Sequence, residues 1–113
     1  AGKKVSAADD FFCTPTYSGL LSEVIVKLLD RDMKGLYHAA GPDFMDRYEY
    51  VSKIAEAFGF NKDLIKKVKL KDLKLRAKRP KKGGLKIDKI CGAIDIRPKD
   101  CDYYLKLLKE ELL

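Results

Sequence analysis

The feature that most constrains this chain is a helical repeat of apolar residues early in the sequence. Within TYSGLLSEVIVKLLDRD, side chains recur at the i, i+4 and i+8 spacing of one helix face. These residues are Leu20, Leu21, Val24, Ile25, Leu28 and Leu29. Thr16 precedes the repeat, and we predict it as the N-cap because a hydroxyl can accept a hydrogen bond from a free backbone N–H. Such a helix must pack its apolar face against other elements.

Two further segments have the pattern of helices. Residues 46–59 begin with Asp46 as a predicted cap, followed three residues later by Glu49 in a capping-box arrangement, and end at Gly59. A last helix follows Pro98. Its predicted inward face consists of Tyr104, Leu105, Leu108 and Leu112.

Three segments have the pattern of strands. Residues 5–8 form a short β-like run, residues 35–41 (GLYHAAG) form a brief apolar run, and residues 66–73 alternate Lys with apolar side chains. The predicted order is strand, helix, strand, helix, strand, loop, helix. We therefore predict one domain over residues 1–113, a small α/β or α+β layer structure. Its short sheet of about three strands would pack with three to four helices.

Composition excludes several classes of protein. The chain is 46% hydrophobic, so it is not compositionally disordered, and its apolar runs fall far short of the roughly 20 residues that a membrane span needs. Cys13, Cys91 and Cys101 show no CxxC spacing and His38 is the only histidine, so we expect no metal site. Reduced thiols favour a cytoplasmic protein. Because the sequence starts without Met and almost directly in a strand, we expect a fragment or a processed chain.

Positive charge is concentrated in one region. The net charge is +7, but residues 62–89 contain 13 Lys or Arg against three Asp, a local balance of +10. Within this region, residues 75–86 read LRAKRPKKGGLK. Three interpretations stay open: a solvated loop, a phosphate site in which Arg76 or Arg79 reaches a diphosphate, or a nucleic-acid patch. Nucleic acid is the least favoured, because no aromatic RNA-binding pair or helix-turn-helix accompanies the charge.

Catalytic motifs are missing from the sequence. It contains no GxGxxG or GxxxxGK[ST] phosphate loop. We interpret His38, inside the apolar run 35–41, as a packed or hydrogen-bonded histidine rather than a catalytic one. Asp9 and Asp10 are neighbours that point to opposite sides of a strand, so they form no carboxylate dyad. We therefore predict no catalytic residue in this chain.

Four motifs nevertheless occur in a familiar order: DDFFCTPTY, KGLYHAAG, RYEYVSKIAEAFG and RAKRPKKGGL. Together they resemble the C-terminal, substrate-binding half of the dTDP-4-dehydrorhamnose reductase family of extended short-chain dehydrogenases. The family stretches read approximately D-x-x-x-S-P-T-Y, G-x-Y-H-x-A-G, S-R-Y-E-x-A-x-x-I and A-R-R-P-x-N-S-x-L. Lys82-Gly83 replaces the usual Asn-Ser and Lys86 the usual Asp, which leaves the sugar open. The non-catalytic regulatory subunit of methionine adenosyltransferase shares these motifs, so a regulatory or binding module is the alternative.

The resemblance implies that the chemistry belongs to another part of a longer protein. The parent would be an NAD(P)-dependent oxidoreductase that reduces a nucleotide-linked keto-sugar for surface-polysaccharide biosynthesis, with NADP or NAD on a Rossmann half that is absent here. In this family a Tyr-x-x-x-Lys pair protonates the product. No tyrosine of this chain has Lys four residues later, since Lys53 follows Tyr50 by only three. The chain alone should therefore be inert and bind no cofactor.

The resemblance also implies which residues bind substrate. Arg79, in the Arg-Pro pair of the loop motif, and Arg76 are candidates for the diphosphate, and Thr16 and Tyr17 at a helix start are candidates for the sugar pocket. We interpret Arg47, at the start of the second helix, as structural. The expected partners are a nucleotide-sugar and the Rossmann half. An isolated fragment should oligomerise or exchange strands, because a sheet edge and apolar surface would be uncovered.

Overall fold

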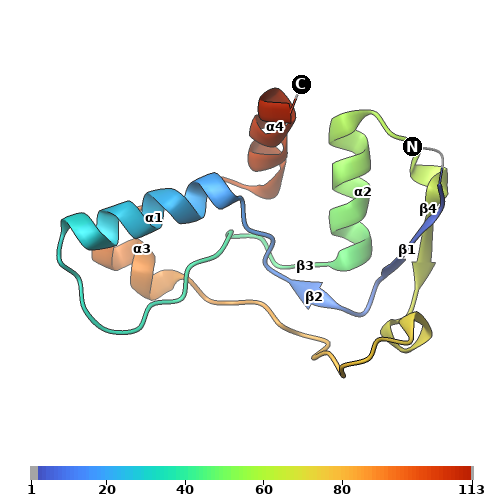
Figure 1. The fold of residues 1–113 in the computed structure, drawn as a ribbon, viewed down its shortest axis with the longest axis horizontal. Coiled ribbons are helices and arrows are strands. Elements are labelled where there is room, and N and C mark those ends of the chain that lie inside the picture. Colours follow the sequence, from blue (N-terminus) through green and yellow to red (C-terminus); the bar gives the residue numbers. More distant parts are fainter. Residues whose placement is uncertain (1–2, 113) are drawn as a thin grey trace.

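The computed structural model describes residues 3–112, which form a flat molecule with extents of 46 × 35 × 19 Å (Figure 1). It confirms a small α+β structure with four helices and short sheets. The elements in order are β1 (Val5–Ala8), β2 (Phe12–Cys13), α1 (Ser18–Asp30), β3 (Met45–Asp46), α2 (Arg47–Phe58), η1 (Lys62–Leu64), β4 (Ile65–Val68), η2 (Leu70–Leu73), α3 (Asp88–Ile94) and α4 (Cys101–Leu112).

Backbone pairing produces two sheets of two strands each. β1 and β4 run parallel, in a register that places Val5 opposite Ile65 and Ala8 opposite Val68. β2 and β3 pair antiparallel over two residues each. Strands of two residues leave no period-2 pattern in a sequence, which is why the sequence did not predict them.

The strand predicted at 66–73 is shorter in the structure. It starts one residue earlier and ends at Val68, and η2 follows it. Two carboxylates accept hydrogen bonds from the backbone where the chain turns. Asp10 Oδ1 accepts from the Leu70 N–H at 2.7 Å, and Asp72 Oδ2 accepts from the N–H of the residue after Val68 at 3.1 Å. These bonds replace the ladder that a longer strand would need.

The strand predicted at 35–41 is wrong, because the structure has no strand there. Side chains satisfy the backbone of this segment instead. Lys89 Nζ donates to one of its carbonyl oxygens at 2.7 Å, and Thr16 Oγ1 accepts from the Gly41 N–H at 3.1 Å. His38 is exposed rather than packed in a core.

Thr16 does not cap α1, contrary to the prediction. The N-cap is Tyr17, whose side chain makes no capping hydrogen bond. Thr16 Oγ1 donates to Thr14 O at 3.0 Å while it accepts from Gly41. A Cβ at position 41 would lie 2.0 Å from Pro15 O, so only glycine allows the two segments to approach this closely. The hydroxyl therefore joins two segments of chain instead of starting a helix.

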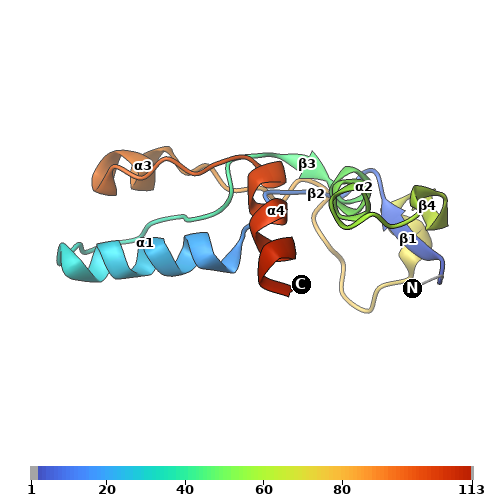
Figure 2. The ribbon, with the colours of Figure 1, turned by 90° about the horizontal axis from the view of Figure 1, so that it is seen from above.

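Two apolar clusters hold the helices together. α1 contributes Leu20 and Val24 to the first, which also contains Ile90, Ile94 and Ile96 from α3 and the turn after it. Of the other apolar residues of the α1 repeat, Leu28 is half-buried against this cluster, and Leu21, Ile25 and Leu29 stay exposed. The second cluster lies where α2 meets α4 and consists of Met45, Cys101 and Leu105. In Figure 2, α1 and α3 occupy one end of the molecule, and β1 and β4 the other.

The predicted cap of α2 is confirmed. Asp46 Oδ1 accepts from the Glu49 N–H at 2.7 Å. Gly59 ends the helix with φ of 75°, in the left-handed region that glycine adopts at little cost. α2 is therefore fixed at both ends by local interactions, and its first turn lies beside β1.

Candidate functional site

The positively charged segment forms a pocket of about 690 Å³ together with η2. Its lining residues come from one stretch of chain, residues 70–81. Six of them are basic: Lys71, Lys74, Arg76, Lys78, Arg79 and Lys81. No acidic side chain lines it within the part of the chain that the structure describes. We call this pocket the basic groove, and its crowded cations produce a positive field that favours an anionic ligand.

Contacts at both ends hold the loop of the basic groove and leave its side chains free: a backbone hydrogen bond at its end and a side-chain ion pair before its start. At its end, the Phe12 N–H donates to Lys81 O at 2.6 Å. Before its start, Lys69 Nζ lies 2.9 Å from Asp9 Oδ1, and this hydrogen bond holds the pKa of Asp9 below its usual value. Of the six basic residues, only Lys81 has an ion-pair partner among the described residues, Asp10 at 3.9 Å. The other five are available to a ligand.

A second pocket, of about 480 Å³, adjoins the basic groove. The two pockets share Leu75 and Arg79. The remaining lining comes from β1, the turn after it, η2 and the first turns of α2: Ser6, Ala7, Ala8, Phe11, Arg47, Val51 and Leu73. We call this the arginine pocket, because Arg47 and Arg79 are the charged residues among those that line it. Arg47 was interpreted from the sequence as structural, so its place here was missed.

Thr16 and Tyr17 line a different pocket, of about 240 Å³, between the start of α1 and α4. The Tyr17 ring stacks on Tyr104 with centroids 5.4 Å apart, and its hydroxyl donates to Glu111 Oε1. The four residues predicted to bind substrate therefore divide into two pairs. Arg76 and Arg79 share the basic groove, while Thr16 and Tyr17 share this smaller pocket.

Two further groups of the smaller pocket could act as a nucleophile or base if they ionised. Burial raises the pKa of the Cys101 thiol to about 11, and burial also raises the pKa of Tyr50. Both groups therefore stay protonated at neutral pH, and a protonated thiol is a poor nucleophile. The pocket can bind but has no activated group among these two.

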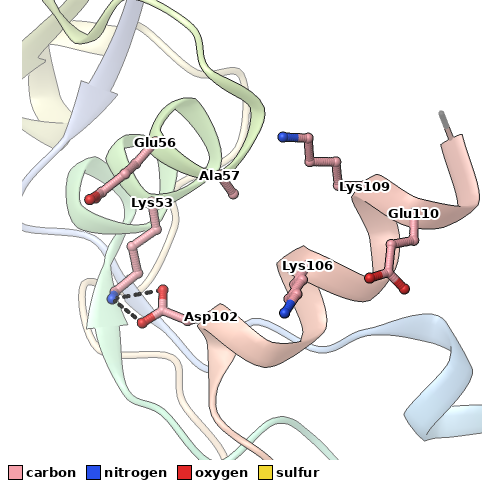
Figure 3. Close-up of a pocket in the computed structure, with 7 residues that line it drawn as sticks. All are labelled: Lys53, Glu56, Ala57, Asp102, Lys106, Lys109 and Glu110. Carbon is pink, nitrogen blue, oxygen red and sulfur yellow. Dashed lines mark hydrogen bonds and ion pairs between the residues drawn. The ribbon is translucent and has the colours of Figure 1, made fainter.

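A cleft of about 800 Å³ lies between α2 and α4 (Figure 3). Three basic and three acidic residues line this α2–α4 cleft: Lys53, Lys106, Lys109, Glu56, Asp102 and Glu110. Lys53 Nζ donates to both carboxylate oxygens of Asp102, at 3.2 and 3.3 Å, and this hydrogen bond raises the pKa of Lys53. Its charges balance, so the cleft favours neither anions nor cations.

The described residues do not fit a nicotinamide cofactor. A dinucleotide site needs a glycine-rich turn that leads from a strand into a helix. β1 runs into the acidic pair Asp9-Asp10, and β4 runs into Lys69. We therefore derive no hydride transfer from these residues. Within residues 3–112, no cluster of three or more His, Cys, Asp or Glu side chains could hold a metal ion. Nor does that part of the chain contain a helix long and apolar enough to cross a membrane.

Solved structures share this fold. A dTDP-4-dehydrorhamnose reductase from Bacillus anthracis, in complex with NADP, matches 96% of this chain with a TM-score of 0.86 and 21% identity. The enzyme of the same name from Yersinia enterocolitica matches 100% of the chain with a TM-score of 0.86 and 20% identity. That from Clostridium acetobutylicum matches 97% with a TM-score of 0.84 and 19% identity. The chain spans only 38% to 39% of the length of these proteins.

Two further comparisons concern the sequence itself. The search of curated proteins returned no match. The family model described as the RmlD substrate binding domain matches residues 1–113, the whole chain. This match covers all four motifs noted in the sequence and agrees with the shared fold. The chain therefore belongs to the RmlD substrate binding domain family.

Proposed function

We propose that this chain is the nucleotide-sugar-binding part of a reductase that acts on dTDP-4-dehydrorhamnose or a related nucleotide-linked keto-sugar. The observation that carries the proposal is the basic groove, six cations without an acidic neighbour in its lining, in a fold shared with dTDP-4-dehydrorhamnose reductases. A nucleotide-linked sugar carries a diphosphate, which is the anion that such a groove suits. A guanidinium group can donate two parallel hydrogen bonds to two phosphate oxygens, so Arg76 and Arg79 are the proposed contacts.

We assign the sugar end to Thr16 and Tyr17. The hydroxyl of Thr16 is already bonded to Thr14 and Gly41, so we expect it to shape the pocket rather than to contact the sugar. The ring of Tyr17 is half-buried and its hydroxyl is held by Glu111, so it offers both an apolar surface and a polar end.

The rest of the proposed reaction belongs to another part of the parent protein. We propose that the parent binds NADP, as the Bacillus anthracis neighbour does, and supplies the proton donor. This chain alone would then leave NADPH unoxidised in the presence of a keto-sugar. Three unpaired cysteines support a cytoplasmic location for the parent. The exposed apolar residues of α1 would contact the cofactor half or, in the isolated chain, a second copy.

Calorimetric titration tests the binding proposal directly. At low ionic strength, we expect dTDP to bind and thymidine, which lacks the diphosphate, to bind at least about tenfold more weakly. Arg76→Met and Arg79→Met should each weaken dTDP binding about tenfold, since each removes a charge-assisted contact. Arg97→Met is the matched control, because the Arg97 side chain is 90% exposed and lies outside both the basic groove and the arginine pocket. Equal affinity for dTDP and thymidine would refute the proposal.

A further inference from the structure

Arg47 has an unusual position at the start of α2. Its guanidinium lies over the Phe11 ring, with Cζ 5.1 Å from the centroid, and its backbone N–H donates to Phe11 O at 2.9 Å. Its side-chain Nε is buried, yet it has no hydrogen-bond partner among the residues that the structure describes. A buried donor of a charged group without a partner is costly, so it calls for an explanation.

The surroundings of Arg47 favour an anion. Arg47 and Arg79 line the same pocket, and no carboxylate of residues 3–112 lines it with them. The remaining walls are mostly apolar, with Ala7, Ala8, Val51, Leu73 and Leu75 among them. An apolar wall lowers the local dielectric, which strengthens both the repulsion between two cations and their attraction for an anion. An anionic ligand would relieve the repulsion and give the guanidinium of Arg47 a partner.

We propose that Arg47 is a binding residue for a phosphoryl group, together with Arg79, in the arginine pocket. Arg79 lines both the basic groove and the arginine pocket. Two phosphoryl groups, one in each pocket, would therefore both contact Arg79. A diphosphate meets this requirement because its two phosphoryl groups are covalently linked. The identification of that diphosphate with a nucleotide-sugar rests on the proposed function, whereas the role of Arg47 rests on the pocket itself.

The groove lysines and Arg47 differ in how firmly they are held, and this difference supports a phosphoryl site at Arg47. The groove lysines are all exposed, so they are suited to attracting an anion from solution. Arg47 is held by Phe11 and by the first turn of α2, so its planar fork is already oriented. Lysines thus raise the local anion concentration, and the oriented fork selects a group with phosphate geometry.

Nitrogen-15 NMR of the arginine side chains tests this assignment, because the chain contains only five arginines. The probe is inorganic pyrophosphate, titrated into the protein while the Nε–Hε signals are followed. We expect the signals of Arg47 and Arg79 to shift along one saturation curve and the signal of Arg97 to stay in place. Arg47→Lys assigns the Arg47 signal. If that variant does not fold, Arg→Lys changes at the other four positions assign it by elimination.

The affinity of Arg47→Lys separates a binding role from a structural one. This substitution keeps the positive charge and removes the fork, so we expect pyrophosphate to bind about tenfold more weakly while the circular dichroism of the helices is unchanged. Arg97→Lys should bind as the wild type does. An Arg47 signal that stays in place while Arg79 saturates, or an unchanged affinity in Arg47→Lys, would overturn the inference.

A second titration with dTDP distinguishes this inference from the proposed function. If pyrophosphate saturates Arg47 and Arg79 but dTDP binds no more tightly than pyrophosphate does, the phosphoryl site stands and the nucleotide-sugar assignment fails. If dTDP binds tightly and shifts Arg76 and Arg79 but not Arg47, the proposed function stands and the role of Arg47 fails.

Discussion

The α2–α4 cleft and the basic groove are both lined by many charged side chains, but only the cleft contains its own counter-charges. In the cleft, three basic residues face three acidic ones, and Lys53 pairs with Asp102. Among the described residues, six basic side chains and no acidic one line the groove, and the single ion pair of these six, Lys81 with Asp10, spans 3.9 Å. Lysine therefore serves two purposes in one small chain: it neutralises a helix interface in one region and stays available to a ligand in the other.

The two regions also differ in what lies behind their charges. Met45, Cys101 and Leu105 are buried where α2 meets α4, so apolar packing fixes the walls of the cleft. No side chain of residues 71–86 is buried, and the groove takes its shape from backbone hydrogen bonds at the ends of its loop. Substitutions in the cleft should therefore change stability, and substitutions in the groove should change binding.

The largest expected effect comes from removing a leucine behind the cleft. Leu105 is 4% exposed, so Leu105→Ala should lower the free energy of unfolding by about 3 kcal/mol, through lost apolar contact and a cavity. Leu75→Ala is the matched change in the groove, where the side chain is 48% exposed, and should cost less than about 0.5 kcal/mol. Urea unfolding measures both values. Equal losses would show that the groove is packed as the cleft is.

The next effect compares three lysines from each region. Changing Lys71, Lys74 and Lys78 to Gln should weaken dTDP binding about tenfold at low salt, and by less near 1 M salt, where charges are screened. The same change at the cleft lysines should leave the affinity unaltered. The cleft positions in that control are Lys53, Lys106 and Lys109. Similar losses in both triple variants would show that only overall charge matters and would remove the distinction between the regions.

A smaller effect should follow from the cap of α2, the helix that lines both the cleft and the arginine pocket. Asp46→Ala removes the acceptor for the Glu49 N–H and should lower the free energy of unfolding by about 1 kcal/mol. Asp46→Asn keeps an acceptor and removes the charge, so its loss should be clearly smaller. Thermal unfolding of the two variants separates the hydrogen bond from the charge. If both variants lose the same amount, the charge rather than the cap stabilises this helix end.

The parts of the fold that follow from local signals could be predicted from the sequence. The helix pattern and the Asp46 cap need only residues within one or two turns, and the excess charge of the groove needs only a count. The segment at 35–41 looked like a strand because it is short and apolar. Its backbone is satisfied instead by the distant Lys89 and Thr16, which no local pattern reveals.

The candidate site was predictable only where its residues are contiguous. Arg76 and Arg79 lie in one loop, so their grouping follows from the sequence alone. Arg47 joins Arg79 through a pocket whose walls come from β1, η2 and α2, and only the folded chain brings these together. Thr16 shows the opposite error, a role predicted from local sequence that the fold replaces. Its residue type suits a helix cap, but Gly41 approaches closely and donates its N–H to the Thr16 hydroxyl instead.

The smallest expected effect concerns the ion pair between Lys69 and Asp9, which borders the groove at the end of β4. Lys69 lowers the pKa of the half-buried Asp9 carboxyl through a hydrogen bond at 2.9 Å. A carboxyl whose pKa is lower in the folded chain stabilises it above the unfolded pKa, here 3.8, and this stabilisation is lost as the pH falls through the folded value. Asp9→Asn should therefore lower the melting temperature slightly at pH 7 and by progressively less below pH 3.8.

The matched control is Asp95→Asn, because Asp95 faces Arg97 at 3.8 Å and both side chains are almost fully exposed. Such pairs contribute little, so this variant should follow the wild type throughout the acid range. If Asp9→Asn also follows the wild type, the Asp9–Lys69 pair contributes nothing measurable to stability. Lys69 would then behave like the unpaired lysines of the groove, and the groove would extend to the end of β4.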